Sequence, residues 1–96
     1  MKIPSKLKIG NEIYTISQLI EDQKDDYYGN SSHKYQWIKI DFRQLSEDHT
    51  GETFFHEVIH QILDHAKFTE ETNNEKLVSV LANGIYQVLK DNKLLK

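Results

Sequence analysis

Residues 55–66, with the sequence FHEVIHQILDHA, decide the fold of this chain. Their apolar side chains recur at intervals of three and four positions, which places them on one face of an α-helix. Ser46 and Thr50 are alternative N-cap residues, because either hydroxyl can accept a hydrogen bond from a backbone amide of the first turn. The pattern predicts an amphipathic helix whose apolar face consists of Phe55, Val58, Ile59, Ile62 and Ala66.

The chain before this helix has the periodicity of strands. Between residues 6 and 41, apolar and polar side chains tend to alternate, as in strands that bury one face. Gly10-Asn11 suits a two-residue hairpin turn, and residues 29–32 suit a turn or bulge after the start of a third strand. Residues 35–41 have the clearest strand pattern, whereas the charged residues 21–26 suit an exposed loop.

A second helix is predicted after a break at residues 67–74. Thr72 followed by Glu75 matches a capping box at the start of this helix. Gly84 with Ala82 would allow the two helices to approach closely. The apolar residues of the second helix are Leu77, Val78, Leu81, Ala82, Ile85, Val88 and Leu89.

The predicted fold class is α+β, with a small antiparallel β-sheet of three or four strands followed by two helices. We expect one domain that spans residues 1–96. A chain of this length buries a thin core, and a free sheet edge can pair with a second copy. The expected oligomeric state is therefore a monomer or a weak homodimer.

The composition excludes several classes of site and partner. The chain has no cysteine, so disulfides and thiolate metal sites are absent. Its net charge is −3 and its lysines are scattered, which predicts no nucleic-acid partner. No apolar stretch approaches the roughly 20 residues that span a bilayer, and no secretory signal pattern is visible. We expect a soluble, cytoplasmic protein with no membrane partner.

Residues 56–60 read HEVIH and match the H-E-x-x-H motif. Side chains four positions apart on a helix differ by about 40° around its axis and about 6 Å along it. His56 and His60 can therefore converge on one zinc ion. Glu57 lies about 100° further round the helix, where it can take a proton from a zinc-bound water whose pKa is lowered to about 7. The alternative is a pair of solvated histidines.

A catalytic zinc site needs a third protein ligand and one open position. Asp64 lies about 9 Å too far along the helix axis, and His65 is off the histidine face. The break after the helix lets the second helix return antiparallel, so Glu75 in its first turn is the preferred third ligand. Glu71 and Glu70 remain alternatives, and Glu75 could instead serve only as a helix cap.

Other side chains are weaker candidates. His49 lies seven residues before His56 and could line the same face if the helix extends that far, but the preferred interpretation is a solvated residue near the start of the helix. Tyr86 is expected in the core rather than at an oxyanion. Aromatic residues of the predicted strands could form a substrate wall, although aromatics in strands usually serve packing; they are Tyr27, Tyr28, Tyr35 and Trp37.

The order of these elements resembles that of the small phage- and prophage-encoded minimal gluzincins, which are HExxH zinc metallopeptidases. It is more distantly similar to the ImmA/IrrE-type metallopeptidases. The resemblance covers most of the chain, from the hairpin at residues 6–16 to residues 91–92. It is most specific at residues 55–63 (FHEVIHQIL) and 74–84 (NEKLVSVLANG). In gluzincins the third zinc ligand is a glutamate on the following helix, often in an Asn-Glu pair such as Asn74-Glu75.

The resemblance implies a hydrolase that cuts a peptide bond in a peptide or protein substrate. It implies that His56, His60 and Glu75 bind zinc and that Glu57 is the general base. It also suggests that an edge strand, at residues 35–41, binds the substrate backbone by strand addition. Two other functions remain open. One is a non-catalytic, zinc-stabilised interaction module of phage or prophage origin, and the other is a plain interaction domain without metal.

Overall fold

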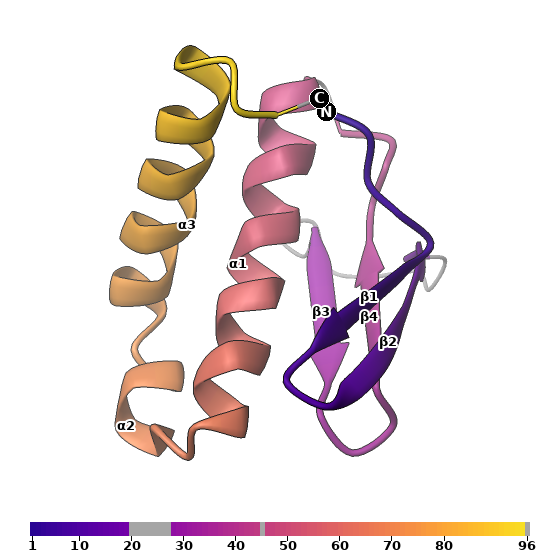
Figure 1. The fold of residues 1–96 in the computed structure, drawn as a ribbon, viewed down its shortest axis with the longest axis vertical. Coiled ribbons are helices and arrows are strands. Elements are labelled where there is room, and N and C mark those ends of the chain that lie inside the picture. Colours follow the sequence, from indigo (N-terminus) through magenta and orange to yellow (C-terminus); the bar gives the residue numbers. More distant parts are fainter. Residues whose placement is uncertain (20–27, 45, 96) are drawn as a thin grey trace.

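The computed structural model describes residues 1–19, 28–44 and 46–95. The strands are β1 (Lys6–Ile9), β2 (Glu12–Gln18), β3 (Gly29–Ser32) and β4 (Trp37–Ile40). The helices are α1 (Glu47–His65), α2 (Thr69–Thr72) and α3 (Glu75–Asp91). Helix α1 lies between the sheet and α3, and the short α2 connects the two long helices (Figure 1). The predicted α+β class, a sheet followed by helices, is confirmed.

Among the described residues, the strands form one sheet in the order β1-β2-β4-β3. Strands β1 and β2 are antiparallel around Gly10, whose φ of 57° lies in the left-handed region that glycine adopts without a Cβ penalty. Strands β3 and β4 are also antiparallel, whereas β2 and β4 pair in parallel. The prediction of a fully antiparallel sheet is therefore wrong. The sheet is mixed because β3 lies at the edge and β4 lies between β3 and β2.

Residues 29–32 are a strand, so the prediction of a turn or bulge at this position is wrong. The turn lies instead at residues 33–36, where Gln36 has a φ of 56° and the Tyr35 amide donates to Ser32 Oγ over 3.1 Å. The sequence of β3, GNSS, has no apolar alternation, so its strand state depends on pairing with β4 and packing on α1. The loop expected at residues 21–26 lies outside the described residues.

Two apolar cores lie on opposite sides of α1. The core between the sheet and α1 contains Ile9, Tyr14, Ile16, Ile38, Ile40 and Phe54. The core between α1 and α3 contains Ile59, Val78 and Ala82, and Phe55 packs against both cores. The predicted single apolar face of α1 is therefore only partly buried, and Ile62 is 50% exposed. Because α1 is covered on two sides, it also buries the polar residues Glu57 and Gln61.

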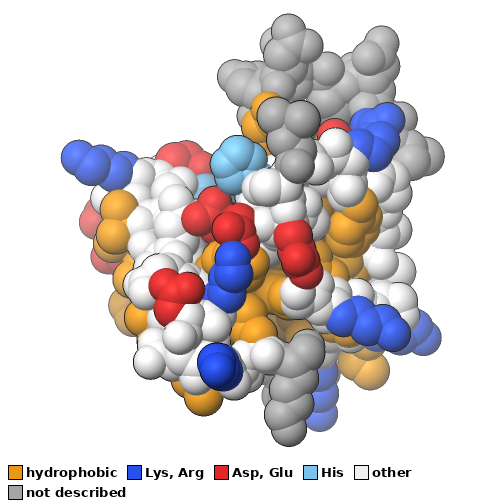
Figure 2. Space-filling model, turned by 90° about the horizontal axis from the view of Figure 1, so that it is seen from above, with side chains coloured by type: hydrophobic (Ala, Val, Ile, Leu, Met, Phe, Trp, Pro, Cys, Tyr) orange, Lys and Arg blue, Asp and Glu red, His pale blue; other side chains and the backbone are white. Residues whose placement is uncertain are grey.

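The start of α1 is fixed by polar contacts. Ser46 is its N-cap, and Ser46 Oγ accepts a hydrogen bond from the His49 amide over 3.1 Å. Glu47 and Asp48 in the first turn complement the positive end of the helix dipole. Seen from above, acidic side chains and a histidine gather at this end of the molecule, with lysine or arginine side chains near them (Figure 2).

Two helical glycines have opposite surroundings. A Cβ at Gly51 would lie 2.4 Å from Cε1 of Tyr86, so this glycine allows the Tyr86 ring to pack directly on α1. A Cβ at Gly84 would meet nothing within 4 Å. The predicted close helix contact at Gly84 is therefore wrong, because this part of α3 faces away from α1. None of the helices in the described ranges is long and apolar enough to cross a bilayer.

Candidate metal centre

The structure brings together the predicted ligands His56, His60 and Glu75. Both histidines project from α1 toward Glu75, which is the first residue of α3. The Nε2 atoms of His56 and His60 are 3.1 Å apart. The Glu75 carboxylate bridges them, with one oxygen 3.0 Å from His56 Nε2 and the other 2.8 Å from His60 Nε2. Potential ligand atoms of the three residues lie within 4.8 Å of one another, so this group of side chains, His56, His60 and Glu75 (the metal cluster), could hold a metal ion.

The spacing of these atoms suits a small tetrahedral ion. Zinc bonds to imidazole nitrogen at about 2.0–2.1 Å, which gives a ligand-to-ligand distance of about 3.3 Å in a tetrahedron. The observed separations of 2.8–3.1 Å are slightly shorter than this edge. The three donor atoms could therefore surround one ion with little adjustment of their side chains.

The outer nitrogen of each histidine has a hydroxyl partner. Thr72 Oγ1 lies 3.0 Å from His60 Nδ1 and donates its own proton to the His60 carbonyl over 3.3 Å. When the hydroxyl proton goes to this carbonyl, the hydroxyl accepts from Nδ1–H, and the Nε2 lone pair of His60 is free. Ser79 Oγ lies 3.3 Å from His56 Nδ1 and can act in the same way.

This arrangement points lone pairs at one another. With Nδ1 protonated, His60 Nε2 is an acceptor that faces a carboxylate oxygen of Glu75, and an ionised carboxylate also only accepts. Two acceptors at 2.8 Å repel each other unless a proton or a metal ion lies between them. The chemistry of the donor set therefore fits a metal ion, in agreement with the spacing.

The position of Glu75 corrects the predicted capping box. The N-cap of α3 is Asn74, whose side-chain oxygen accepts from the Leu77 amide over 3.1 Å. Thr72 belongs to α2 and contacts His60 instead. Glu75 is thus the first helical residue, not the third after a cap, and its carboxylate is free to face the histidines.

The alternative ligands lie outside this group. Glu70 and Glu71 are in the first turn of α2 and are not part of the metal-binding cluster. Asp64 borders the pocket but does not join the cluster, as its height on the helix predicted. His65 instead places Nε2 3.0 Å from the hydroxyl oxygen of Tyr14.

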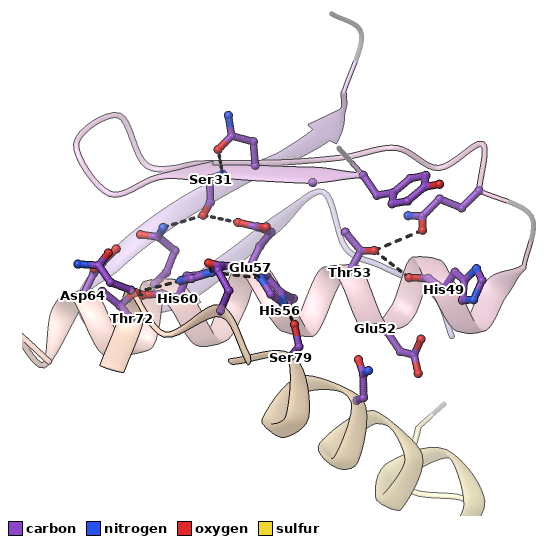
Figure 3. Close-up of a pocket in the computed structure, with 18 residues that line it drawn as sticks. Ser31, His49, Glu52, Thr53, His56, Glu57, His60, Asp64, Thr72 and Ser79 are labelled. Carbon is purple, nitrogen blue, oxygen red and sulfur yellow. Dashed lines mark hydrogen bonds and ion pairs between the residues drawn. The ribbon is translucent and has the colours of Figure 1, made fainter. Parts of the chain in front are cut away.

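Glu57 projects toward the sheet rather than toward α3 (Figure 3). It is only 7% exposed, and its Oε1 accepts a hydrogen bond from Ser31 Oγ over 2.6 Å. Burial raises the pKa of the Glu57 carboxyl above its ordinary value. The Ser31 hydrogen bond and the nearby His56 and His60 act in the opposite direction but do not cancel this effect.

A pocket of about 860 Å³ joins the metal cluster to Glu57. Its walls come from β3, α1 and α3, and Figure 3 shows their side chains around it. His49 lies exposed in the first turn of α1, as expected, and it borders this pocket without joining the metal cluster. Tyr28 also lines the pocket.

The other predicted aromatic candidates do not line this pocket. Tyr35 is exposed in the turn after β3, and Trp37 lies under the ammonium of Lys39, 4.4 Å from the ring centroid. Tyr27 lies outside the described residues. Tyr86 is buried, as predicted, and its hydroxyl donates to Asp48 over 2.9 Å.

The prediction of an edge strand at residues 35–41 is also wrong. Strand β4 occupies Trp37–Ile40 and pairs with β2 on one side and β3 on the other. In the described part of the chain, β3 is the edge strand next to the pocket, which Gly29, Asn30 and Ser31 line. Because β3 has a polar, glycine-containing sequence, the alternation pattern could not reveal this edge.

Three polar contacts of the site were not predicted from the sequence. Thr72 and Ser79 hold the histidine rings, and Ser31 holds Glu57. Ser31 lies 26 positions before Glu57, and no local spacing connects the two residues. The signal that was available is the position of Ser79, four residues after Glu75 on the same predicted helix.

No protein-family model, curated protein or solved structure matches this chain.

Proposed function

We propose that this protein is a zinc-dependent metallopeptidase in which His56, His60 and Glu75 hold the metal and Glu57 is the general base. The position of Glu57 is the observation that carries the proposal. Its carboxyl is buried at 7% exposure and borders the same pocket as the metal cluster, yet it is not one of the cluster's three ligands. A glutamate beside a metal site, and not bound to the metal, is the general base of H-E-x-x-H metallopeptidases.

The proposed reaction is hydrolysis of a peptide bond. The metal supplies Lewis acidity, which makes a water molecule in the pocket more acidic and polarises the substrate carbonyl. Glu57 accepts a proton from that water and later donates it to the leaving amine. The raised pKa of Glu57 supports both roles, because a carboxyl with this shift can hold a proton closer to neutral pH.

The proposed substrate is an extended peptide segment. Strand β3 pairs on one side only within the described residues, and its residues line the pocket. Unpaired backbone groups of an edge strand can bind a peptide by strand addition. A substrate bound in this way would pass between β3 and the metal cluster.

The test uses the untagged protein, stripped with a chelator and reconstituted with zinc. Bound zinc is measured by elemental analysis, and cleavage is followed by mass spectrometry on a peptide library. Glu57→Gln is expected to retain zinc and to lose cleavage by a factor on the order of 10²–10⁴. His60→Ala is expected to lose both. Wild-type protein that binds no zinc, or Glu57→Gln that cleaves as fast as wild type, would contradict the proposal.

A second candidate is a zinc-stabilised interaction module without catalysis. The metal cluster supports it, because a metal ion bound by these residues would link α1 to the first residue of α3. This candidate predicts a zinc-dependent melting temperature in both wild type and Glu57→Gln, with no cleavage by either. The peptide library separates the two functions.

A further inference from the structure

A hydrogen-bond chain links Glu57 to the centre of the sheet. Ser31 Oγ donates to Glu57 Oε1 over 2.6 Å, and Gln61 Nε2 donates to Ser31 Oγ over 2.8 Å. The Tyr14 hydroxyl donates to Gln61 Oε1 over 2.9 Å. Gln61 is 2% exposed and Tyr14 is fully buried, so water does not compete for these bonds at that end of the chain.

The direction of this chain follows from its end. An ionised Glu57 can only accept, so the single hydroxyl proton of Ser31 must go to Glu57. The Ser31 oxygen can then only accept, and the Gln61 amide must turn its NH₂ group toward it. A flipped amide would face Ser31 with a second acceptor and no proton to share.

The donor and acceptor roles at the Tyr14 end of the hydrogen-bond chain follow in the same way. Once Gln61 donates through its nitrogen, its oxygen faces Tyr14, and the Tyr14 proton is used there. The Tyr14 oxygen is then free to accept from His65 Nε2 at 3.0 Å and from His33 Nδ1 at 3.3 Å. Each donor in the chain thus has one partner, and no buried side-chain polar atom in the described part of the protein lacks one.

Gly29 and Ser31, two positions apart on β3, both lie beside the Glu57 side chain. A Cβ at Gly29 would lie 3.3 Å from Glu57 Cγ and 3.4 Å from Oε2. The absence of a side chain at Gly29 thus leaves room for the Glu57 side chain. Oε1 accepts from Ser31, and Oε2 accepts no hydrogen bond from another group in the described part of the protein.

We propose that Ser31, Gln61 and Tyr14 are positioning residues for Glu57, which fix its carboxyl with Oε1 engaged and Oε2 free for proton transfer. The catalytic consequence rests on the proposed function, whereas the orientation of the carboxyl does not. Tyr14 and Gln61 act through Ser31, so the effect of each depends on the Ser31 hydroxyl.

The first measurement needs no activity. In zinc-free, ¹⁵N-labelled protein, the Gln61 side-chain amide is expected to give two well-separated, slowly exchanging NMR signals. Ser31→Ala and Tyr14→Phe should each shift both signals and speed their exchange with solvent by roughly tenfold or more. Ser32→Ala is the matched control, because the Ser32 hydroxyl accepts from the Tyr35 amide and does not contact this chain. If Ser31→Ala changed neither the chemical shifts nor the exchange rates of the Gln61 side-chain amide, the proposal would be overturned.

The second measurement uses the zinc-loaded protein and a cleaved peptide. Ser31→Ala is expected to lower kcat by roughly 10–100-fold, which is the usual effect of losing an outer hydrogen bond at a metal site. KM and zinc affinity should stay within twofold of wild type. Ser31→Thr keeps the hydroxyl and should restore most of kcat. A merely structural role would lower the melting temperature of Ser31→Ala and leave kcat unchanged below it, which would contradict the proposal.

The two proposals fail in different ways. A wild-type protein without cleavage, but with the expected Gln61 signals, would overturn the metallopeptidase and support the positioning chain. Normal wild-type cleavage, with a Ser31→Ala variant that keeps full kcat, would overturn the positioning role and leave the metallopeptidase intact.

Discussion

Helix α1 carries two polar pairs with the same spacing, and they face different neighbours. His56 and His60 face α2 and α3, whereas Glu57 and Gln61 face the sheet. The two pairs are offset by one residue, which turns the second about 100° around the helix. Identical spacing therefore produces two different structures, and the elements packed on each side determine which one forms.

The two faces differ in what they lack. On the sheet face, Ser31, Gln61 and Tyr14 each donate to an acceptor within the protein, and the network needs no bound species. On the α3 face, the histidine nitrogens and Glu75 bring acceptors within 2.8–3.1 Å of one another, and the Glu75 side chain is 69% exposed. The first arrangement is held by hydrogen bonds within the protein, whereas the second could hold a metal ion. The comparison teaches that one helix can combine a finished network with an open binding site.

The largest expected effect comes from removing the metal cluster. With zinc at 100 times its Kd, wild-type protein should gain about 2.7 kcal/mol in free energy of unfolding. His60→Ala should gain none, because two ligands remain. Chemical denaturation with and without zinc measures this difference.

The matched control for His60→Ala is His49→Ala, since His49 lines the same pocket outside the metal cluster. It should keep the full zinc effect. If both variants lost the effect equally, or if His60→Ala kept it, the assignment of the open site to this face of α1 would be wrong.

A smaller effect is expected from the hydroxyl behind His60. Thr72→Val removes the partner of His60 Nδ1 and leaves a shape of similar volume. Zinc affinity should fall by roughly 10–100-fold, because the ring loses the contact that fixes its tautomer. Competition with a chromophoric chelator measures the change in Kd. Thr69→Val in the same short helix is the control, since Thr69 is exposed, and equal losses in both variants would contradict the role of Thr72.

Gly29→Ala should damage the sheet face and spare the metal face. The new Cβ would lie 2.6 Å from Thr53 Cγ2, so β3 must move away from α1. Overpacking of this kind costs about 1–3 kcal/mol of unfolding free energy, while zinc affinity should stay within a few-fold. The control Gly84→Ala meets no atoms within 4 Å and should stabilise the protein by about 0.5–1 kcal/mol. Denaturation of zinc-free protein tests both, and an unchanged stability of Gly29→Ala would refute the predicted clash.

The sequence was sufficient for features that depend on local spacing. The H-E-x-x-H pair, the Gly10 turn and the two long helices each follow from residues within a few positions of one another, whereas the cap of the first helix was left open between Ser46 and Thr50. The choice of Glu75 needed one long-range assumption, that the second helix returns antiparallel beside the first. The structure brings Glu75 to both histidines, in agreement with that assumption.

Features that depend on distant partners were not predictable in this way. Strand β3 is polar, and it forms because β4 and α1 pack against it. The parallel pairing of β2 with β4 depends on the path of the chain between them, which no local pattern encodes. The burial of Gln61 and Glu57 was not predicted for the same reason. A single apolar stripe predicts one covered face, whereas α1 is covered on two.

The smallest expected effect compares the two faces through their buried tyrosines. Burial raises the pKa of Tyr86, on the α3 face, to about 12, and its hydrogen bond to Asp48 adds to the shift. Burial also raises the pKa of Tyr14, on the sheet face. In the unfolded chain both tyrosines ionise near their ordinary pKa of 10.0. The folded state therefore binds protons that the unfolded state has lost, and stability should fall as pH rises from about 10 to about 12.

Tyr86→Phe and Tyr14→Phe should each flatten this alkaline slope in zinc-free protein, and the double variant should flatten it further. Lys90 keeps part of the slope in every variant, because its contact with Asp48 also raises its pKa. Urea denaturation at pH values between 9 and about 11.5 measures the slope. Tyr14 packs in the core between α1 and the sheet, whereas Tyr86 belongs to α3, so the two contributions report the two faces of α1 separately. If Tyr86→Phe left the slope unchanged while Tyr14→Phe reduced it, the raised pKa of Tyr86 would not contribute to the fall in stability at high pH, and the prediction for the α3 face would be wrong.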